Sequence, residues 1–292
     1  MIQGTGAAIV TPFNKSGEID KKSLESLINH LINNGTDFIV SLGTTSEAVT
    51  LNKLEKDVVM SLVKEYVRGR VPIVMGLGGN STAGVCEEIN NTNFDGVDAI
   101  LSVAPYYNKP NQRGIYAHFA EIAKICPVPI ILYNVPGRTS SNISASTCIK
   151  LANDFEKIVA VKEASGDMNQ VMEIIKNRPK DFSVLSGDDA LTYPMMTLGG
   201  NGVISVVAMA YPKEFSDMVN LCLKGDYEGA KQLHYSLVEF IDLLFEDGNP
   251  AGIKASLEVI GLLENNLRLP MVPVLNDHYA AIKKFITEYK QP

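Results

Sequence analysis

Residues 129–165 read PIILYNVPGRTSSNISASTCIKLANDFEKIVAVKEAS and contain the repeat that decides the fold. A short apolar run, PIILYNV, leads into a turn with Pro and Gly, then into a segment with helical character, and then into a second apolar run, IVAVKEAS. Near-continuous apolar runs are typical of strands buried on both faces of a parallel sheet. This stretch therefore predicts one strand–helix unit followed by the next strand.

The same pattern extends along the chain in both directions. Six more apolar runs begin near Ala7, Phe38, Pro72, Ala99, Ser183 and Gly202. Successive starts lie 19 to 34 residues apart, which is about the length of one βα unit. Eight such units predict an α/β fold, the (β/α)8 TIM barrel. The alternative is an open doubly wound sheet. A dinucleotide-binding sheet would carry GxGxxG after its first strand, whereas GTGAAIV precedes or enters the first strand.

Helix signals separate the apolar runs. Asp20 is a predicted N-cap, and Asn52 with Glu55 resembles a capping box. Apolar residues at helical spacing follow each of them: Leu24, Leu27, Ile28 and Leu31 in one segment, and Leu54, Val58, Leu62 and Tyr66 in the other. After the eighth run we expect helices at 213–224, 226–245, 251–263 and 277–288. We therefore predict a catalytic barrel at residues 1–224 and a helical region at 225–292 packed on it.

Composition narrows the class of protein. The chain has 292 residues, with 26 basic and 33 acidic side chains and a net charge of −7. This balance argues against a nucleic-acid surface, which needs clustered Lys and Arg. No apolar run reaches the ~18 residues of a membrane span. The N-terminal residues lack signal-peptide features, and the four cysteines form no CxxC pair. We expect a cytoplasmic protein with no nucleic-acid or membrane partner.

Lys162 is the sharpest chemical signal, because the active site of a barrel lies at the carboxyl ends of its strands. It follows the apolar run IVAV, and strand alternation places it on one face with Ala160 and Ala164, whose small side chains leave room. Burial favours the neutral amine, which is the form that attacks a ketone. The structural alternative is a buried ion pair between Lys162 and Glu47 or Glu163.

Metal chemistry is the rival mechanism for carbon–carbon bond enzymes. A metal site needs converging His or carboxylate ligands. All four histidines fall in segments with helical character, and Asp188 and Asp189 follow a strand where acids more often cap the next helix. The sequence therefore predicts neither a metal nor another cofactor.

Hydroxyl groups and one arginine follow other predicted strands. Thr44 and Thr45 come directly after the second strand, where paired hydroxyls and backbone N–H groups can hold a small carboxylate. An ordinary turn before a capped helix is the alternative. Arg138 lies in the turn after the fifth strand, and its guanidinium suits a substrate carboxylate, although an exposed arginine is usually just solvated.

Taken together, these segments resemble the pyruvate-dependent class I aldolase family, which includes N-acetylneuraminate lyase. The resemblance covers essentially the whole chain. It is closest to the members that condense pyruvate with L-aspartate 4-semialdehyde in lysine and diaminopimelate biosynthesis. The motifs are GTGAAIVTPF (4–13), GTTSEAVTL (43–51), APYYNKP (104–110), YNVPGRT (133–139), VKEASGD (161–167), LSGDD (185–189) and LRLP (267–270).

The resemblance implies specific roles for residues in these motifs. Lys162 would form an imine with pyruvate, Thr44 and Thr45 would hold its carboxylate, and Thr45, Tyr133 and Tyr107 would relay protons. Arg138 would bind the semialdehyde carboxylate. The Ile204 main-chain oxygen and the loop at Gly187 would line the pocket. In this family Tyr107 reaches a neighbouring subunit's site, so the resemblance implies a homo-oligomer with a dimer as the minimal unit and a tetramer as the usual form.

Two departures from the family pattern are present. The loop after the second strand is usually Gly-Thr-Thr-Gly-Glu, and here Ser46 replaces the second glycine. Asn80 and Tyr106 match the family's site for feedback inhibition by L-lysine. However, Gly84 stands where sensitive members usually carry a glutamate, and Lys53 and Lys56 would repel a cation. We therefore expect weak or absent inhibition by L-lysine.

Sibling aldolases that act on N-acetylneuraminate or 2-keto-3-deoxy sugar acids are the nearest alternative. They resemble this chain through the lysine, the fifth-strand tyrosine and the threonine loop. The PGRT turn with Arg138 separates them, since a sugar substrate needs hydroxyl partners there. A barrel kept only for ligand binding would be expected to lose Lys162, Tyr133 or Thr45, and all three are present.

Overall fold

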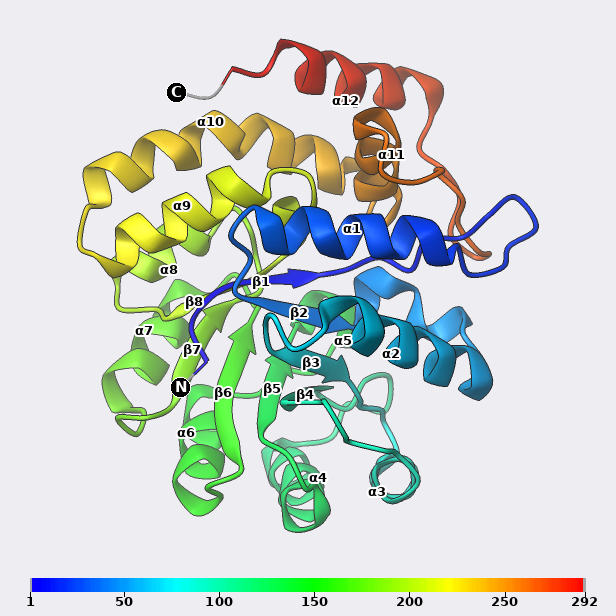
Figure 1. Ribbon diagram of the computed structural model, residues 1–292. Helices are drawn as coiled ribbons and strands as arrows, with labels where there is room; N and C mark the ends of the chain where they lie inside the picture. Colours follow the sequence, from blue (N-terminus) through cyan, green and yellow to red (C-terminus); the bar gives the residue numbers. More distant parts are fainter. Residues whose placement is uncertain (1, 291–292) are drawn as a thin grey trace. The chain divides into compact units, whose positions relative to one another are not determined.

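The computed structural model describes residues 2–290 of the chain. Its eight strands form a closed barrel in chain order, from β1 to β8 (Figure 1). Each strand begins within three residues of the start predicted from its apolar run. The predicted (β/α)8 barrel is confirmed, and the open doubly wound sheet is wrong.

Two compact units make up the described chain. The first contains the residues up to Gly4 and Ile73–Ile204. Its strand pairs are parallel, and helices α4 and α6 lie outside strands β4 to β6 (Figure 1). The elements are β3 (Ile73–Gly76), α3 (Thr82–Asn90), β4 (Ala99–Val103), α4 (Gln112–Ile125), β5 (Ile130–Asn134), α5 (Pro136–Thr139), α6 (Ala145–Asp154), β6 (Ile158–Glu163), α7 (Met168–Asn177), β7 (Ser183–Ser186), α8 (Thr192–Thr197) and β8 (Gly202–Ser205).

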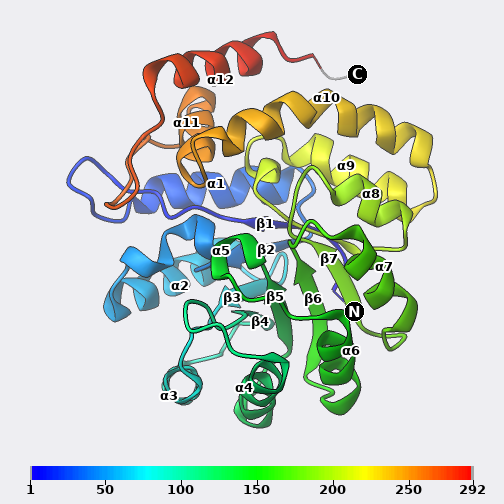
Figure 2. The ribbon, with the colours of Figure 1, turned by 180° about the vertical axis from the view of Figure 1, so that it is seen from behind.

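The second unit contains Thr5–Pro72 and the chain from Ser205 onward. Strands β1 and β2 pair in parallel, and α10 lies along α9 and contacts α11 and α12 (Figure 2). The elements are β1 (Gly4–Ala8), α1 (Lys21–Asn33), β2 (Phe38–Ser41), η1 (Thr44–Ser46), η2 (Ala48–Thr50), α2 (Lys53–Val67), η3 (Val207–Met209), α9 (Pro212–Leu223), α10 (Tyr227–Glu246), α11 (Ala251–Ile260) and α12 (Asn276–Glu288).

The predicted C-terminal helices are confirmed, and only α11 ends as much as three residues early. Buried side chains of Ala251, Ala255, Val274 and Ile282 pack together between α11 and the segment that ends in α12. The predicted boundary between residues 224 and 225 stays a prediction. Met1, at the start of the predicted barrel, and residues 291 and 292, at the end of the helical region, lie outside the described residues.

The predicted caps of α1 and α2 are confirmed, whereas the predicted apolar faces are confirmed for α1 only. The Asp20 carboxylate accepts a hydrogen bond from the Ser23 N–H, and Asn52 and Glu55 form a reciprocal capping box at α2. All four predicted apolar residues of α1 are buried. The predicted stripe of α2 is wrong for Leu54 and Val58, which are 76% and 41% exposed. The buried face of α2 instead contains Val59, Met60, Leu62, Val63 and Val67, because this helix has apolar side chains on more than one face.

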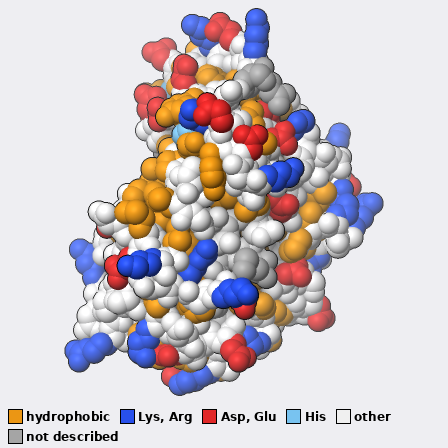
Figure 3. Space-filling view, turned by 90° about the vertical axis from the view of Figure 1, so that its left-hand side faces the viewer, with side chains coloured by type: hydrophobic (Ala, Val, Ile, Leu, Met, Phe, Trp, Pro, Cys, Tyr) orange, Lys and Arg blue, Asp and Glu red, His pale blue; other side chains and the backbone are white. Residues whose placement is uncertain are grey.

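The surface carries charges of both signs. Basic and acidic side chains are interspersed on the face drawn in Figure 3, without a single-sign field. Of the helices in the described residues, none is long and apolar enough to cross a bilayer.

Candidate active site

Lys162 and Tyr133 lie side by side on neighbouring strands of the first unit. The register of β5 against β6 pairs them directly. Both side chains are buried, with exposed fractions of 6% for Lys162 and 8% for Tyr133. The Lys162 Nζ atom lies 4.4 Å from the centroid of the Tyr133 ring. An amine and a phenol are therefore held together at the carboxyl ends of two adjacent strands.

Gly187 provides the space that the Lys162 side chain occupies. A Cβ atom at Gly187 would lie 2.7 Å from the Ala164 Cβ and 3.0 Å from both Cγ and Cε of Lys162. The Gly187 N–H donates to the Glu163 carbonyl oxygen at 2.8 Å, which fixes the loop after β7 against β6. A side chain at position 187 would therefore displace the lysine.

Glu163 lies next to Lys162 in the strand, and amide groups hold its carboxylate. Its two oxygens accept hydrogen bonds from Asn134 Nδ2 at 3.2 and 3.0 Å, and one also accepts from Gln170 Nε2 at 3.0 Å. The Ser165 N–H donates to it at 2.7 Å. A buried carboxylate needs such donors. They satisfy Glu163 without the neighbouring lysine, and they join β5, β6 and α7 just outside the Lys162–Tyr133 pair.

The other predicted residues of this unit lie in loops, in the short helix α5 or in strand β8. Tyr107 is 86% exposed and has a left-handed backbone, with φ of 75°. The Asn80 side chain donates to the carbonyl oxygen of Tyr106 at 3.2 Å. Arg138 is exposed on α5, and Ile204 is buried on β8. The structure thus brings Lys162, Tyr133 and Gly187 together directly and leaves Tyr107 and Arg138 at the surface of the unit.

Thr44 and Thr45 belong to the second unit and have different surroundings. Both lie in η1, where Thr44 is exposed and Thr45 is only 4% exposed. The Thr45 Oγ1 atom accepts a hydrogen bond from Asn249 Nδ2 at 2.8 Å. Ser46, the departure from the family pattern, is buried, and its hydroxyl donates to the Gly43 carbonyl oxygen at 3.1 Å. The serine is thus accommodated within the turn.

Glu47 ends this turn and makes a buried ion pair with Lys254 of α11. The Lys254 Nζ donates to Glu47 Oε1 at 2.5 Å and to the Asn266 carbonyl oxygen at 2.8 Å. The exposed side-chain fractions are 0% for Lys254 and 1% for Glu47. Burial lowers the pKa of Lys254 to about 8, although the Glu47 charge opposes this shift. Glu47 therefore has a cation partner within its own unit.

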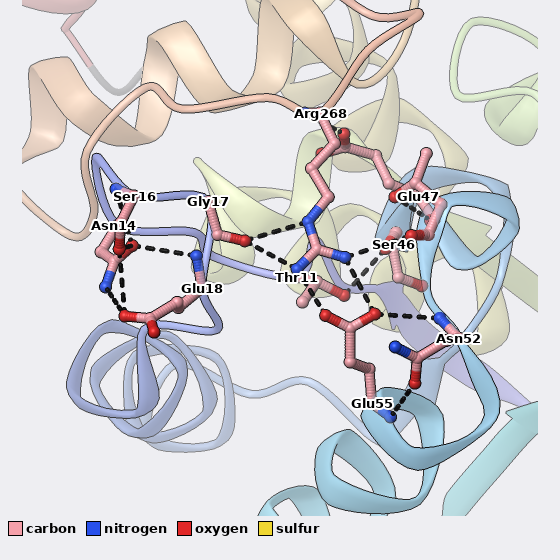
Figure 4. Close-up of polar contacts among 11 residues, drawn as sticks. Thr11, Asn14, Ser16, Gly17, Glu18, Ser46, Glu47, Asn52, Glu55 and Arg268 are labelled. Carbon is pink, nitrogen blue, oxygen red and sulfur yellow. Dashed lines mark hydrogen bonds and ion pairs between the residues drawn. The ribbon is translucent and has the colours of Figure 1, made fainter.

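Arg268 extends the contacts of Glu47 to three neighbouring segments (Figure 4). Its backbone N–H donates to Glu47 Oε2 at 2.9 Å. Its guanidinium donates to both Glu55 oxygens at 2.6 and 3.0 Å, and to the carbonyl oxygens of Gly17 and Thr50. Hydrogen bonds from Arg268 hold the pKa of the Glu55 carboxyl below its usual range.

Sequence reasoning did not find Asn249 or Lys254. The available signal for Lys254 was a single lysine inside AGIKASLEVI, where every neighbour is small, apolar or weakly polar until Glu258. That signal resembles the one that identified Lys162, but here it occurs in a helix.

Metal-ligating side chains do not converge in the described residues: no group of three or more His, Cys, Asp or Glu is placed to hold an ion. The four histidines lie in helices, as predicted. Asp188 Oδ1 accepts hydrogen bonds from the N–H groups of Ala190 and Leu191 at 3.0 and 3.3 Å, within the turn before α8. The N-cap of α8 is Leu191, without a side-chain cap, so the expectation that these acids cap the next helix is wrong.

A model of the dihydrodipicolinate synthetase family matches residues 1–289. The chain belongs to this family. A curated relative, the 4-hydroxy-tetrahydrodipicolinate synthase of Parabacteroides distasonis, is 50% identical over 98% of this chain and 97% of its own length. The family predicted from the sequence is therefore confirmed.

Solved structures of dihydrodipicolinate synthases have the same fold. The chloride-inhibited enzyme of Acinetobacter baumannii, complexed with pyruvate, is 38% identical, with a TM-score of 0.95 over 98% of both chains. The enzyme of Cyanidioschyzon merolae, with lysine bound, is 39% identical, with a TM-score of 0.94 over 98% of this chain and 97% of that one.

Proposed function

We propose that this chain is a lyase that condenses pyruvate with L-aspartate 4-semialdehyde to give 4-hydroxy-tetrahydrodipicolinate, the first committed step of lysine and diaminopimelate biosynthesis. The observation that carries the proposal is the buried lysine–tyrosine pair, Lys162 and Tyr133, at the strand ends of a barrel of this family. The name of the Parabacteroides distasonis relative and the pyruvate bound to the Acinetobacter baumannii relative support the choice of substrates.

Lys162 acts as the nucleophile. Its neutral amine attacks the pyruvate ketone, the carbinolamine loses water, and the protonated imine loses a proton from the methyl carbon to give an enamine. That carbon then attacks the semialdehyde aldehyde, and the resulting alkoxide takes up a proton to become the 4-hydroxyl group. The amine of the semialdehyde next attacks the imine carbon, closes the ring and releases the Lys162 amine. These steps balance without an oxidant, reductant or metal ion.

Tyr133, Thr45 and Tyr107 act as the proton relay in this proposal. The Tyr133 ring lies beside the Lys162 Nζ, and this position supports the Tyr133 phenol as the proton donor to the departing hydroxyl of the carbinolamine. Tyr107 would act in the neighbouring subunit of a homo-oligomer, and its 86% exposed side chain is available for such a contact. We propose a dimer as the minimal unit, a tetramer as the usual form and a cytoplasmic location.

Substrate binding is assigned to five residues. Thr44 and Thr45 hold the pyruvate carboxylate, and Arg138 binds the semialdehyde carboxylate, which suits its exposed guanidinium. The Gly187 loop and the main-chain oxygen of Ile204 line the pocket. A guanidinium favours this substrate over N-acetylneuraminate or sugar acids, which serve as the control substrates.

Imine trapping tests the proposal. Incubation with pyruvate and borohydride is expected to add one reduced pyruvate adduct to the peptide that contains Lys162. A coupled assay with pyruvate and aspartate semialdehyde, run beside N-acetylneuraminate and sugar acids, is expected to show turnover of the semialdehyde. An adduct on another lysine, or no adduct in active protein, contradicts the assignment of Lys162.

A further inference from the structure

We propose that Asn249 is a positioning residue for the Thr45 hydroxyl, and that the buried ion pair between Lys254 and Glu47 keeps Asn249 in place. This inference rests on the proposed function, in which Thr45 binds pyruvate and carries protons. It extends the site to α11, a helix of the C-terminal region that sequence analysis assigned no role.

The hydrogen bond from Asn249 determines the direction in which the Thr45 hydroxyl can donate its proton. A hydroxyl has one proton and two acceptor sites. Asn249 Nδ2 donates to Thr45 Oγ1 at 2.8 Å, so the Thr45 proton points away from Asn249. Both side chains are buried, at 7% and 4% exposure, so water does not compete freely for this contact. Asn249 therefore prepares Thr45 to donate its proton to a ligand.

The Lys254–Glu47 ion pair is a second contact between the segments that contain Thr45 and Asn249. Glu47 lies two residues after Thr45, and Lys254 lies five residues after Asn249. The Lys254 backbone N–H donates to the Pro250 carbonyl oxygen at 3.0 Å, which connects the lysine to the residue after Asn249. Since both charged side chains are almost completely buried, the pair cannot exchange partners with solvent.

The turn itself needs these external contacts. Glu47 has φ of 53°, a left-handed conformation that non-glycine residues adopt at a cost. Its carboxylate accepts from Lys254 Nζ and from the Arg268 N–H, so two distant segments hold this residue in its conformation. Arg268 in turn binds Glu55 at the start of α2, as Figure 4 shows. The position of Thr45 therefore depends on residues about 200 positions later in the chain.

A double-mutant cycle separates positioning from a purely structural role. The variants are Thr45→Val, Asn249→Ala and the double variant, and the readout is kcat/KM for pyruvate at saturating semialdehyde. Asn249→Ala is expected to lower kcat/KM about 3- to 10-fold, the value of one neutral hydrogen bond. In the Thr45→Val background the same change is expected to have no further effect, because Asn249 acts through the hydroxyl.

Three matched variants sharpen this cycle. Thr45→Ser keeps the hydroxyl and should stay sensitive to Asn249→Ala. Asn249→Asp has nearly the same shape but cannot donate, so it draws the Thr45 proton toward itself, and it replaces Asn249→Ala if that variant does not fold. Asn266→Ala is the control: it removes an amide side chain that donates to the Phe13 carbonyl oxygen and makes no hydrogen bond to Thr45. Any loss it causes should be equal in the wild-type background and in the Thr45→Val background.

The outcomes distinguish this inference from the proposed function. Wild-type protein is first tested for turnover and for borohydride trapping with pyruvate, and absence of both refutes the proposed function together with the inference. Wild-type turnover with equal losses from Asn249→Ala in both backgrounds refutes the inference alone. A loss confined to backgrounds that keep the hydroxyl, with the borohydride adduct still on the Lys162 peptide, is the expected result.

Discussion

Replacing Lys254 with methionine should destabilise the protein, because the buried Glu47 carboxylate would lose its positively charged partner. The Glu47 carboxylate would stay buried and keep only the Arg268 N–H as a donor from its present partners. Removing one partner of a buried ion pair costs about 3–5 kcal/mol. With an unfolding entropy of about 2.1 cal/mol/K per residue, a chain of this length unfolds with roughly 0.6 kcal/mol/K, so the melting temperature should fall by about 5–8 °C.

Calorimetry or far-UV circular dichroism on three variants tests this reasoning. The double variant Glu47→Gln with Lys254→Met removes both charges and should recover most of the lost stability, since paired replacement is often nearly neutral. Lys213→Met breaks an exposed pair with Asp217, where both side chains are about half exposed, and should cost under about 1 kcal/mol. If Lys254→Met is no more harmful than Lys213→Met, or if the double variant is worse than the single one, the assigned role of the pair is wrong.

Other parts of the molecule can be tested through four further expected outcomes. Arg138→Ala should leave borohydride trapping of pyruvate intact and lower kcat/KM for the semialdehyde about 10- to 150-fold, the value of a charge-assisted hydrogen bond; equal loss of both would make the arginine structural. L-Lysine should inhibit the wild type weakly or not at all in a steady-state assay, and sub-millimolar inhibition would contradict this prediction. Gly84→Glu should strengthen the inhibition, because Gly84 is exposed and has room for a side chain. Mixed Lys162→Ala and Tyr107→Phe proteins should regain activity after subunit exchange, whereas no recovery despite proven exchange would place Tyr107 in its own subunit's site. Burial lowers the pKa of His118 to about 4, so the unfolded chain binds more protons between about pH 4 and 6.5; stability should fall as pH drops through this range, and less steeply in His118→Gln.

The sequence was sufficient wherever a structural feature depends on nearby residues. The eight strands follow from short apolar runs, and the caps at Asp20 and Asn52 follow from side chains three residues from their partners. The Lys162–Tyr133 pair also follows, because consecutive βα units place their strands side by side. The prediction for α2 was wrong at Leu54 and Val58, since apolar residues on two faces of one helix leave the buried face undecided.

Contacts between distant segments could not be predicted in this way. Glu47 was considered as a partner of Lys162, yet its carboxylate pairs with Lys254, a lysine 207 residues away in a helix. No periodicity connects these two positions, and which acid a buried lysine meets depends on how the C-terminal helices dock. The Asn249–Thr45 hydrogen bond has the same origin, with a separation of 204 residues. The roles of the predicted site residues themselves stay predictions.

The dependence of the 44–47 turn on residues 249, 254 and 268 also has a consequence for biosynthesis on the ribosome. Translation delivers the turn early and its partners last, and chains fold from the N-terminus as they emerge. A nascent chain that already has strands β1 to β8 still lacks the lysine that neutralises Glu47 and the amide that orients Thr45. This part of the site is therefore completed only when the final helices dock, so a polypeptide released prematurely, before Asn249, would contain Lys162 and Tyr133 but not an ordered threonine turn.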